Sequence, residues 1–187
     1  QPVADLISTR FPNTLDLTIW AVAPVILVGI WLGVQAAVHQ NSIIDQAARV
    51  FSIVGTSFPV FVFGLLMLMF FYVKLGWFPP GRISDWANIV VRSDDFHQYT
   101  KLLTFDALLN GRFDIFLDAL RQMVMPILTL SYISWASFLR LTRSSMLETL
   151  RMEYVTTARA NGLTEHDVIF KHAQPNAMIP VFTLAGF

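Results

Sequence analysis

The chain has 187 residues, of which 55% are hydrophobic and only 14% are charged, and its formal net charge is +0. Average soluble domains carry about 25% charged residues, so the composition points to a membrane protein. The zero net charge removes any electrostatic argument for nucleic acid as a partner, and the absence of cysteine excludes a disulfide framework and a cysteine-based metal site.

Three long runs without a charged residue predict membrane spans, at residues 17–38, 50–73 and 122–139. As helices they would be about 27–36 Å long, close to the hydrocarbon thickness of a bilayer. The alternative, buried core helices of a soluble protein, conflicts with the absence of a polar stripe. We therefore predict an all-α, polytopic transmembrane helical bundle.

A fourth apolar run starts at about residue 176 and ends with the sequence before it is long enough to cross a bilayer. The sequence also begins with Gln1 rather than Met. We therefore expect residues 1–187 to form a single, incomplete transmembrane domain of a longer protein or of a truncated chain.

Polar connections separate the spans. Residues 1–14 should approach the first span, residues 39–49 form a short connection, and residues 74–121 form a long one, in which 105–120 has the spacing of a surface amphipathic helix. Because each span crosses once, 39–49 and 140–175 should lie on one side of the membrane. Arg140 and Arg143 follow the third span directly, which favours the cytoplasmic side for that pair.

Prolines and glycines give each span a further feature. Gly29 and Gly33 share one face of the first span, which predicts close packing against another helix, although glycine is also common in spans by chance. Proline kinks a helix by removing a hydrogen bond, which mildly favours a transporter or channel over an anchor. Each hydrophobic run contains one: Pro24, Pro59, Pro126 and Pro180.

The polar stretch 153–175 predicts two short helices joined by a tight turn. Apolar positions at steps of three and four predict a helix over 144–160, ending at Asn161-Gly162, where glycine allows a left-handed cap. Thr164 should cap a second helix, with Asp167 at the third position, and this helix should end near Pro175.

Small residues gather on the first of these helices, at Thr157, Ala158, Ala160 and Gly162. Such a patch would leave a shallow notch in which another protein could sit closely. Alternatively, the alanines only favour the helix and Gly162 serves only as its cap. The residues alone do not choose between these interpretations.

A longer pattern surrounds this patch. It consists of Tyr154-Val155, Thr157-Ala158-Arg159-Ala160 and Gly162-Leu163, followed by His172-Ala173, Asn176-Ala177 and Pro180. With these residues the chain resembles the membrane permease subunits of binding-protein-dependent ABC importers, specifically the dipeptide/oligopeptide (and nickel) type. It departs from the general signature of that family, because Thr156 stands where Glu is usual and Gln174 where Leu is usual.

The resemblance implies that residues 153–175 are a cytoplasmic coupling element that docks in a groove of a separate ATPase subunit. Its docking residues would be Tyr154, Thr157, Ala158, Arg159, Ala160, Asn161 and Gly162. Arg159 would pair with an acidic group of the ATPase or stay solvated. Residue 1 and residues 74–121 would lie outside, in the inner or plasma membrane of a prokaryote.

The resemblance also implies partners. These are ABC ATPase subunits that bind ATP and Mg²⁺, a second permease subunit in a heterodimer, an extracytoplasmic substrate-binding protein that docks near 74–121, and membrane lipid. The full-length permease would have about six spans, and this chain would hold the second to the fourth and the start of the fifth.

An enzyme is not expected. The sequence has no G-x-x-x-x-G-K-[ST] pattern, so the chain should not bind ATP itself, and no H-E-x-x-H; His166 and His172 do not share a helix face. We expect no catalytic residue, metal site or cofactor on this chain. The predicted function is ATP-driven import of di- or oligopeptides by alternating access. Alternatives are another cargo, such as nickel or sugar-like solutes, and a passive channel or scaffold.

Overall fold

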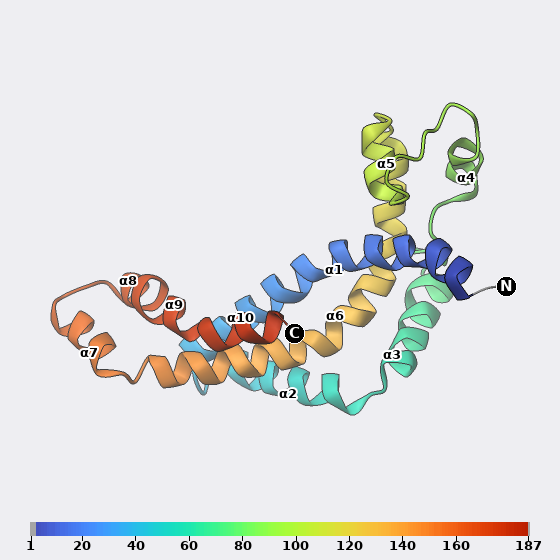
Figure 1. The fold of residues 1–187 in the computed structure, drawn as a ribbon. Helices are drawn as coiled ribbons and strands as arrows, with labels where there is room; N and C mark the ends of the chain where they lie inside the picture. The colour runs from blue at the N-terminus through green and yellow to red at the C-terminus, as the bar shows by residue number, and fades with distance from the viewer. Residues whose placement is uncertain (1–2, 187) are drawn as a thin grey trace. The chain divides into compact units, whose positions relative to one another are not determined.

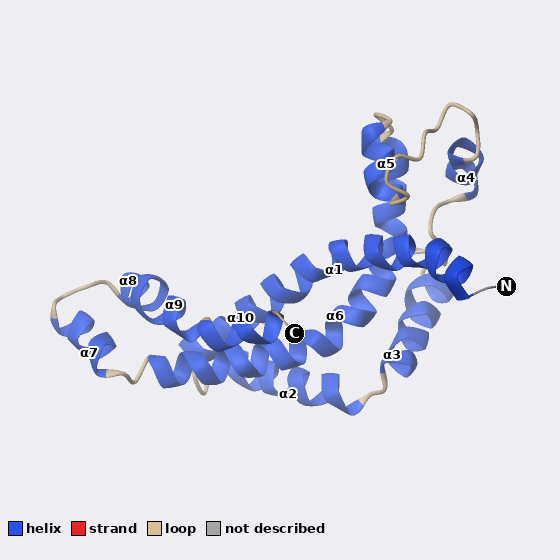
Figure 2. Cartoon of the chain, viewed as in Figure 1, coloured by secondary structure: helices blue, strands red, loops and turns tan. Residues whose placement is uncertain are grey.

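The computed structural model describes residues 3–186, and within this range every regular element is a helix (Figures 1 and 2). The predicted all-α class is therefore confirmed. The described chain forms two compact units. Unit 1 contains the residues up to Val22 together with Val60–Leu130, and unit 2 contains Ala23–Pro59 together with the residues from Ser131.

One described helix, Asp5–Val38, is long and apolar enough to cross a membrane by itself. The number rises to three if Ile43–Ser57 with Val60–Lys74, and Phe113–Tyr132 with Ser134–Thr149, each form one broken span. These three segments contain the three predicted spans.

The first two predicted connections are partly helical. Helix α1 (Val3–Val38) already includes most of the expected approach segment, and α2 (Ile43–Ser57) begins inside the expected connection 39–49. Ser42 caps α2, because its hydroxyl accepts a hydrogen bond from the Asp45 N–H at 3.4 Å.

Pro59 breaks its span where the sequence predicted only a kink. Helix α2 ends at Ser57, and α3 (Val60–Met67) continues into a π-helix, η1 (Leu68–Lys74). Phe58 is extended, with φ −99° and ψ 133°, because the proline ring disfavours the helical conformation in the residue before it.

In unit 1, short helices pack on the first part of α6 (Phe113–Thr149). They are α4 (Asp85–Val91) and α5 (Leu103–Leu109), and their core includes Ala87, Ala107 and Ile115. The predicted helix over 105–120 is wrong. Gly111 has a φ of +68° and ends α5 with a turn, a conformation that glycine adopts without strain.

In unit 2, α1 lies very close to α6 at Gly29 and Gly33. A Cβ atom added at Gly29 would lie 2.5 Å from Cβ of Phe138, and one at Gly33 would lie 2.5 Å from Cβ of Thr142. The glycines therefore allow an approach that any side chain would prevent. On the other side of α6, the Ser52 hydroxyl of α2 donates to the Ala136 carbonyl at 3.0 Å.

The helix predicted over 144–160 is two helices. Helix α6 ends at Thr149, and α7 (Glu153–Ala160) follows after Met152, which is extended. The carbonyl of Leu150, freed at this break, accepts a hydrogen bond from Arg159 Nη1 at 3.5 Å. The break is therefore supported from α7 itself.

Pro175 does not end the following helical segment as predicted. The segment runs through α8 (Glu165–Asp167), a π-helix η2 (Val168–Ala173), α9 (Gln174–Ala177) and α10 (Ile179–Ala185). Pro175 lies in the first turn of α9, directly after the segment changes from the π-helix η2 to an α-helix.

We predict that Gly33→Ala destabilises the protein by about 1–3 kcal/mol, because the new methyl group overpacks the α1–α6 contact. The measurement is the thermal unfolding midpoint in lipid nanodiscs. Gly186→Ala is the matched control, since the nearest atom to its new Cβ is 3.6 Å away. Equal midpoints for the two variants would contradict the close contact.

Candidate functional site

The polar connection in unit 2 is a folded element with its own small core. Val155 and Ala158 of α7 pack against Val168 and Ala173 of η2, with Leu150 beside them. Val155, Val168 and Ala173 are fully buried, and Ala158 is 7% exposed. The second helical segment is therefore held against the first by apolar contact as well as by the turn that joins them.

The turn between the two segments follows the predicted chemistry. Asn161 ends α7, and Gly162 adopts a φ of +82°, with no atom of the described residues within 4 Å of the position a Cβ would take. The Leu163 N–H donates to the Ala158 carbonyl, which closes the turn. The Thr164 hydroxyl accepts from the Asp167 N–H at 3.2 Å and caps α8.

The element contains two ion pairs, one between its two helical segments and one within the second. Arg159 Nε lies 2.8 Å from Glu165 Oε1, and Lys171 Nζ lies 2.6 Å from Asp167 Oδ1. The pKa of the Asp167 carboxyl is lowered from its ordinary value, mainly by the hydrogen bond from Lys171 and to a smaller extent by the one from Thr164. Exposed pairs of this kind contribute little energy individually. Only the Arg159–Glu165 pair joins α7 to the segment that follows, because Lys171 and Asp167 both belong to that segment.

A polar bridge ties α7 to the next helix. The Tyr154 hydroxyl accepts from Asn176 Nδ2 at 2.9 Å and lies 3.4 Å from the His172 carbonyl, to which Asn176 Nδ2 also donates. Since Asn176 belongs to α9, this bridge links the element to the segment that leads into α10.

The predicted docking residues do not share one face of the element. Thr157 and Ala160 are exposed on the face opposite the small core, together with Glu153 and Thr156. We call these four residues the outer face of α7. Tyr154 and Arg159 lie at its flanks, where they make the contacts described above. Asn161 and Gly162 form the exposed turn.

Ala158 cannot line an exposed notch, because it belongs to the core beneath α7. Arg159 is neither simply solvated nor left without an acid, because Glu165 of the same chain pairs with it. Its predicted pairing with an ATPase stays a prediction. Leu163 and Phe170, each 41% exposed, add apolar surface beside the turn that the sequence did not indicate.

The sequence also did not reveal a buried ion-pair cluster elsewhere in unit 2. Asp45, fully buried near the start of α2, accepts from Arg143 Nε at 2.6 Å and Nη2 at 2.9 Å, and from Arg49 Nη2 at 2.6 Å. An i,i+4 spacing could have suggested Asp45 with Arg49. No local signal joins Asp45 to Arg143.

Among the described residues, no group of three or more His, Cys, Asp or Glu side chains is placed to hold a metal ion. The contacts of the polar element are hydrogen bonds, ion pairs and apolar packing.

Comparison with known proteins identifies the family. Residues 26–187 match the family described as "Binding-protein-dependent transport system inner membrane component". The chain belongs to this family. The predicted location in a bacterial inner membrane is therefore confirmed.

Several relatives are similar over nearly the whole chain. The di/tripeptide transport system permease protein DppB of Pseudomonas aeruginosa is 40% identical over 95% of this chain and 51% of its own length. The dipeptide transport system permease protein DppB of Escherichia coli is 40% identical over 99% of this chain and 54% of its own length. The oligopeptide transport system permease protein AppB of Bacillus subtilis is 35% identical over 99% and 51%, respectively.

These relatives confirm the predicted resemblance to permeases of the dipeptide/oligopeptide type. The chain spans about half the length of the relatives that it matches. The docking roles of individual residues, including Gly162 at the turn, stay predictions.

We predict that Ala158→Trp loosens the structure of residues 153–175 and that Ala160→Trp does not. The indole at 158 must displace the core beneath α7 and should loosen residues 153–175, whereas at 160 it extends into solvent. Hydrogen–deuterium exchange of this peptide measures the difference. Faster exchange in both variants, or in neither, would contradict the burial assigned to Ala158.

Proposed function

We propose that this chain is part of the permease subunit of an ATP-driven, binding-protein-dependent importer. The family match supports the transport role, and the printed names of the relatives above favour di- and oligopeptides as cargo. ATP and Mg²⁺ would be bound by separate ATPase subunits, and cargo would arrive on an extracytoplasmic binding protein. A second, related permease subunit would complete the pathway as a heterodimer.

The ATPase would dock on the outer face of α7 and the adjoining turn. The observation that carries this proposal is the folding of 153–175 into a cross-linked unit whose small residues, Thr157 and Ala160, stay exposed. Small side chains allow the backbone of a partner to approach closely. The exposed Leu163 and Phe170 would supply apolar contact area beside them.

The element can transmit movement only if it moves as one body. Its apolar core, the Arg159–Glu165 pair and the Tyr154–Asn176 bridge restrict motion within it. When ATP closes the ATPase subunits, displacement of the element would pull on α6 at one end and on α9 and α10 at the other. Docking would shift the equilibrium between the outward-open and inward-open states only if the docked element binds the ATPase differently in the two states.

A passive channel or scaffold is the weaker alternative. A channel or scaffold would require the long helices, but neither function explains a folded polar element with small residues exposed on one face. For the same reason we place residues 39–49 and 140–175 on the cytoplasmic side, where the ATPase subunits would be reached.

We predict that Ala160→Trp and Thr157→Trp abolish co-purification of the ATPase subunits with the full-length permease. The bulky rings occupy the outer face of α7 without disturbing its core. Asp95→Trp, which places the same ring on an exposed loop of unit 1, should retain the ATPase. If both α7 variants bind the ATPase as the unmodified permease does, the docking assignment is wrong.

A second prediction separates docking from coupling. Tyr154→Phe removes one hydroxyl bridge, so the ATPase should stay bound while cargo uptake per ATP hydrolysed falls about two- to tenfold, the effect of losing roughly one hydrogen bond. Proteoliposomes containing the whole transporter allow both rates to be measured. Tyr99→Phe is the control. An unchanged ratio in Tyr154→Phe would show that the bridge carries no coupling.

A further inference from the structure

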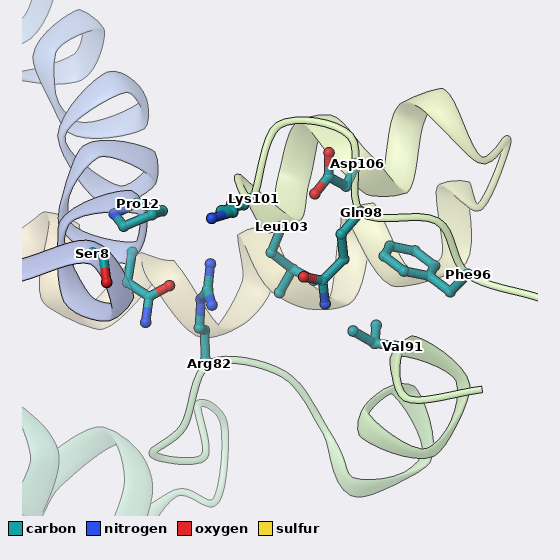
Figure 3. A pocket seen from close by; sticks show the side chains of 10 residues that line it. Ser8, Pro12, Arg82, Val91, Phe96, Gln98, Lys101, Leu103 and Asp106 are labelled. Carbon is teal, nitrogen blue, oxygen red and sulfur yellow. The ribbon is translucent and has the colours of Figure 1, made fainter. Parts of the chain in front are cut away.

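Unit 1 contains a polar cavity that plays no part in the proposed coupling. Its volume is about 380 Å³, and it lies between the start of α1, the loop before α4, and the loop and helix of α5 (Figure 3). Small-ligand sites have volumes of about 300–1,000 Å³. The polar side chains around it include Arg82, Lys101, Asp106, Asn13 and Gln98.

One nitrogen of the half-buried Arg82 side chain lacks a hydrogen bond. Its Nη2 atom is buried and has no hydrogen-bond partner among the described residues, although it forms an ion pair at 3.6 Å with Oδ2 of Asp16. Asp16 already accepts hydrogen bonds from the backbone N–H and the hydroxyl of Thr104. Burial lowers the pKa of the Arg82 guanidinium, although Asp16 opposes this effect. A partly buried guanidinium is stabilised by a ligand whose oxygen atoms accept its hydrogen bonds.

Lys101 brings a second positive charge to the same cavity, from a different loop (Figure 3). Its ammonium has no partner in the part of the chain that the structure describes. The loop is fixed by Asp106, which accepts from the Thr100 N–H at 2.7 Å, the Thr100 hydroxyl at 2.8 Å and the Tyr99 N–H at 3.2 Å. All three bonds reach Oδ1 of Asp106, and they fix the loop that carries Lys101.

We propose that this cavity binds a carboxylate, held by the guanidinium of Arg82 with the ammonium of Lys101 as the second charge. The planar fork of arginine matches the two oxygens of a carboxylate. The carboxylates of Asp16 and Asp106 lie near Arg82, and they would repel a doubly charged phosphate more strongly than a singly charged carboxylate. Asn13 and Gln98 supply amide groups to the remainder of the ligand.

The carboxylate has two possible sources, a small molecule or an acidic side chain of a docked protein. Both present the same group to Arg82 and Lys101. The proposal does not depend on ATPase docking, because every residue that it uses lies in unit 1.

The test measures how fast an amine-acylating reagent modifies Lys101 in the full-length permease in nanodiscs, read by mass spectrometry. N-acetylglycine should slow the reaction severalfold, whereas N-acetylglycinamide, which lacks only the carboxylate, and inorganic phosphate should not. Lys171, which is 70% exposed, is the internal control. Arg82→Gln should weaken protection about tenfold or more, and Arg92→Gln, at an exposed position, should leave it unchanged.

The ligand arms require no variant, so they remain decisive if Arg82→Gln fails to fold. Protection by N-acetylglycine alone supports a site for free carboxylates. Protection only by the purified substrate-binding protein, lost when its carboxyl groups are amidated, supports a docked acidic side chain. Equal protection by the amide or by phosphate, or none by any probe, overturns the proposal and leaves the ATPase co-purification result unaffected.

Discussion

The carboxylate of Asp45 has no contact with solvent, and it is stable there because Arg143 and Arg49 surround it. Breaking a buried ion pair by removing one partner typically costs about 3–5 kcal/mol, because the remaining charge stays buried. This cluster fixes the start of α2 to α6 shortly before α6 ends at Thr149. The Gly29 and Gly33 contacts bring α1 against α6 in the same unit. Three long segments are thus joined near the point where the polar element begins.

This arrangement matters for how a force applied at α7 would spread. Arg159 donates a hydrogen bond to the carbonyl of Leu150, the residue directly after α6. Tyr154 is hydrogen-bonded to Asn176 of α9. The element is therefore linked to both of its neighbours by side chains as well as by the backbone. A push on its outer face would be shared between α6, whose position is fixed by Asp45, and the helices that follow. A loosely hinged loop at the same place would absorb such a push instead.

Local chemistry explains which parts of this structure were predictable. The Asn161-Gly162 turn and the Thr164 cap each depend on one or two neighbouring residues, so the sequence indicates them correctly. The break after Thr149 depends on Arg159 returning to the Leu150 carbonyl, and the orientation of Ala158 depends on η2 packing beneath it. The spacing of apolar residues predicted neither the break after Thr149 nor the burial of Ala158. The Asp45–Arg143 pair joins residues far apart in the chain, and no periodicity could have found it.

Asp45 and Asp16 are both buried aspartates that pair with arginine, but their surroundings differ. Asp45 has its arginines at hydrogen-bond distance, and its carboxylate accepts five hydrogen bonds from Arg143, Arg49 and the Asn41 N–H. Asp16 accepts hydrogen bonds from Thr104, and Arg82 pairs with it at 3.6 Å, which is longer than a hydrogen bond. The first cluster is closed and holds helices together. In the second, the unsatisfied group is the cation, it lines a cavity, and its missing acceptors are what a carboxylate would supply.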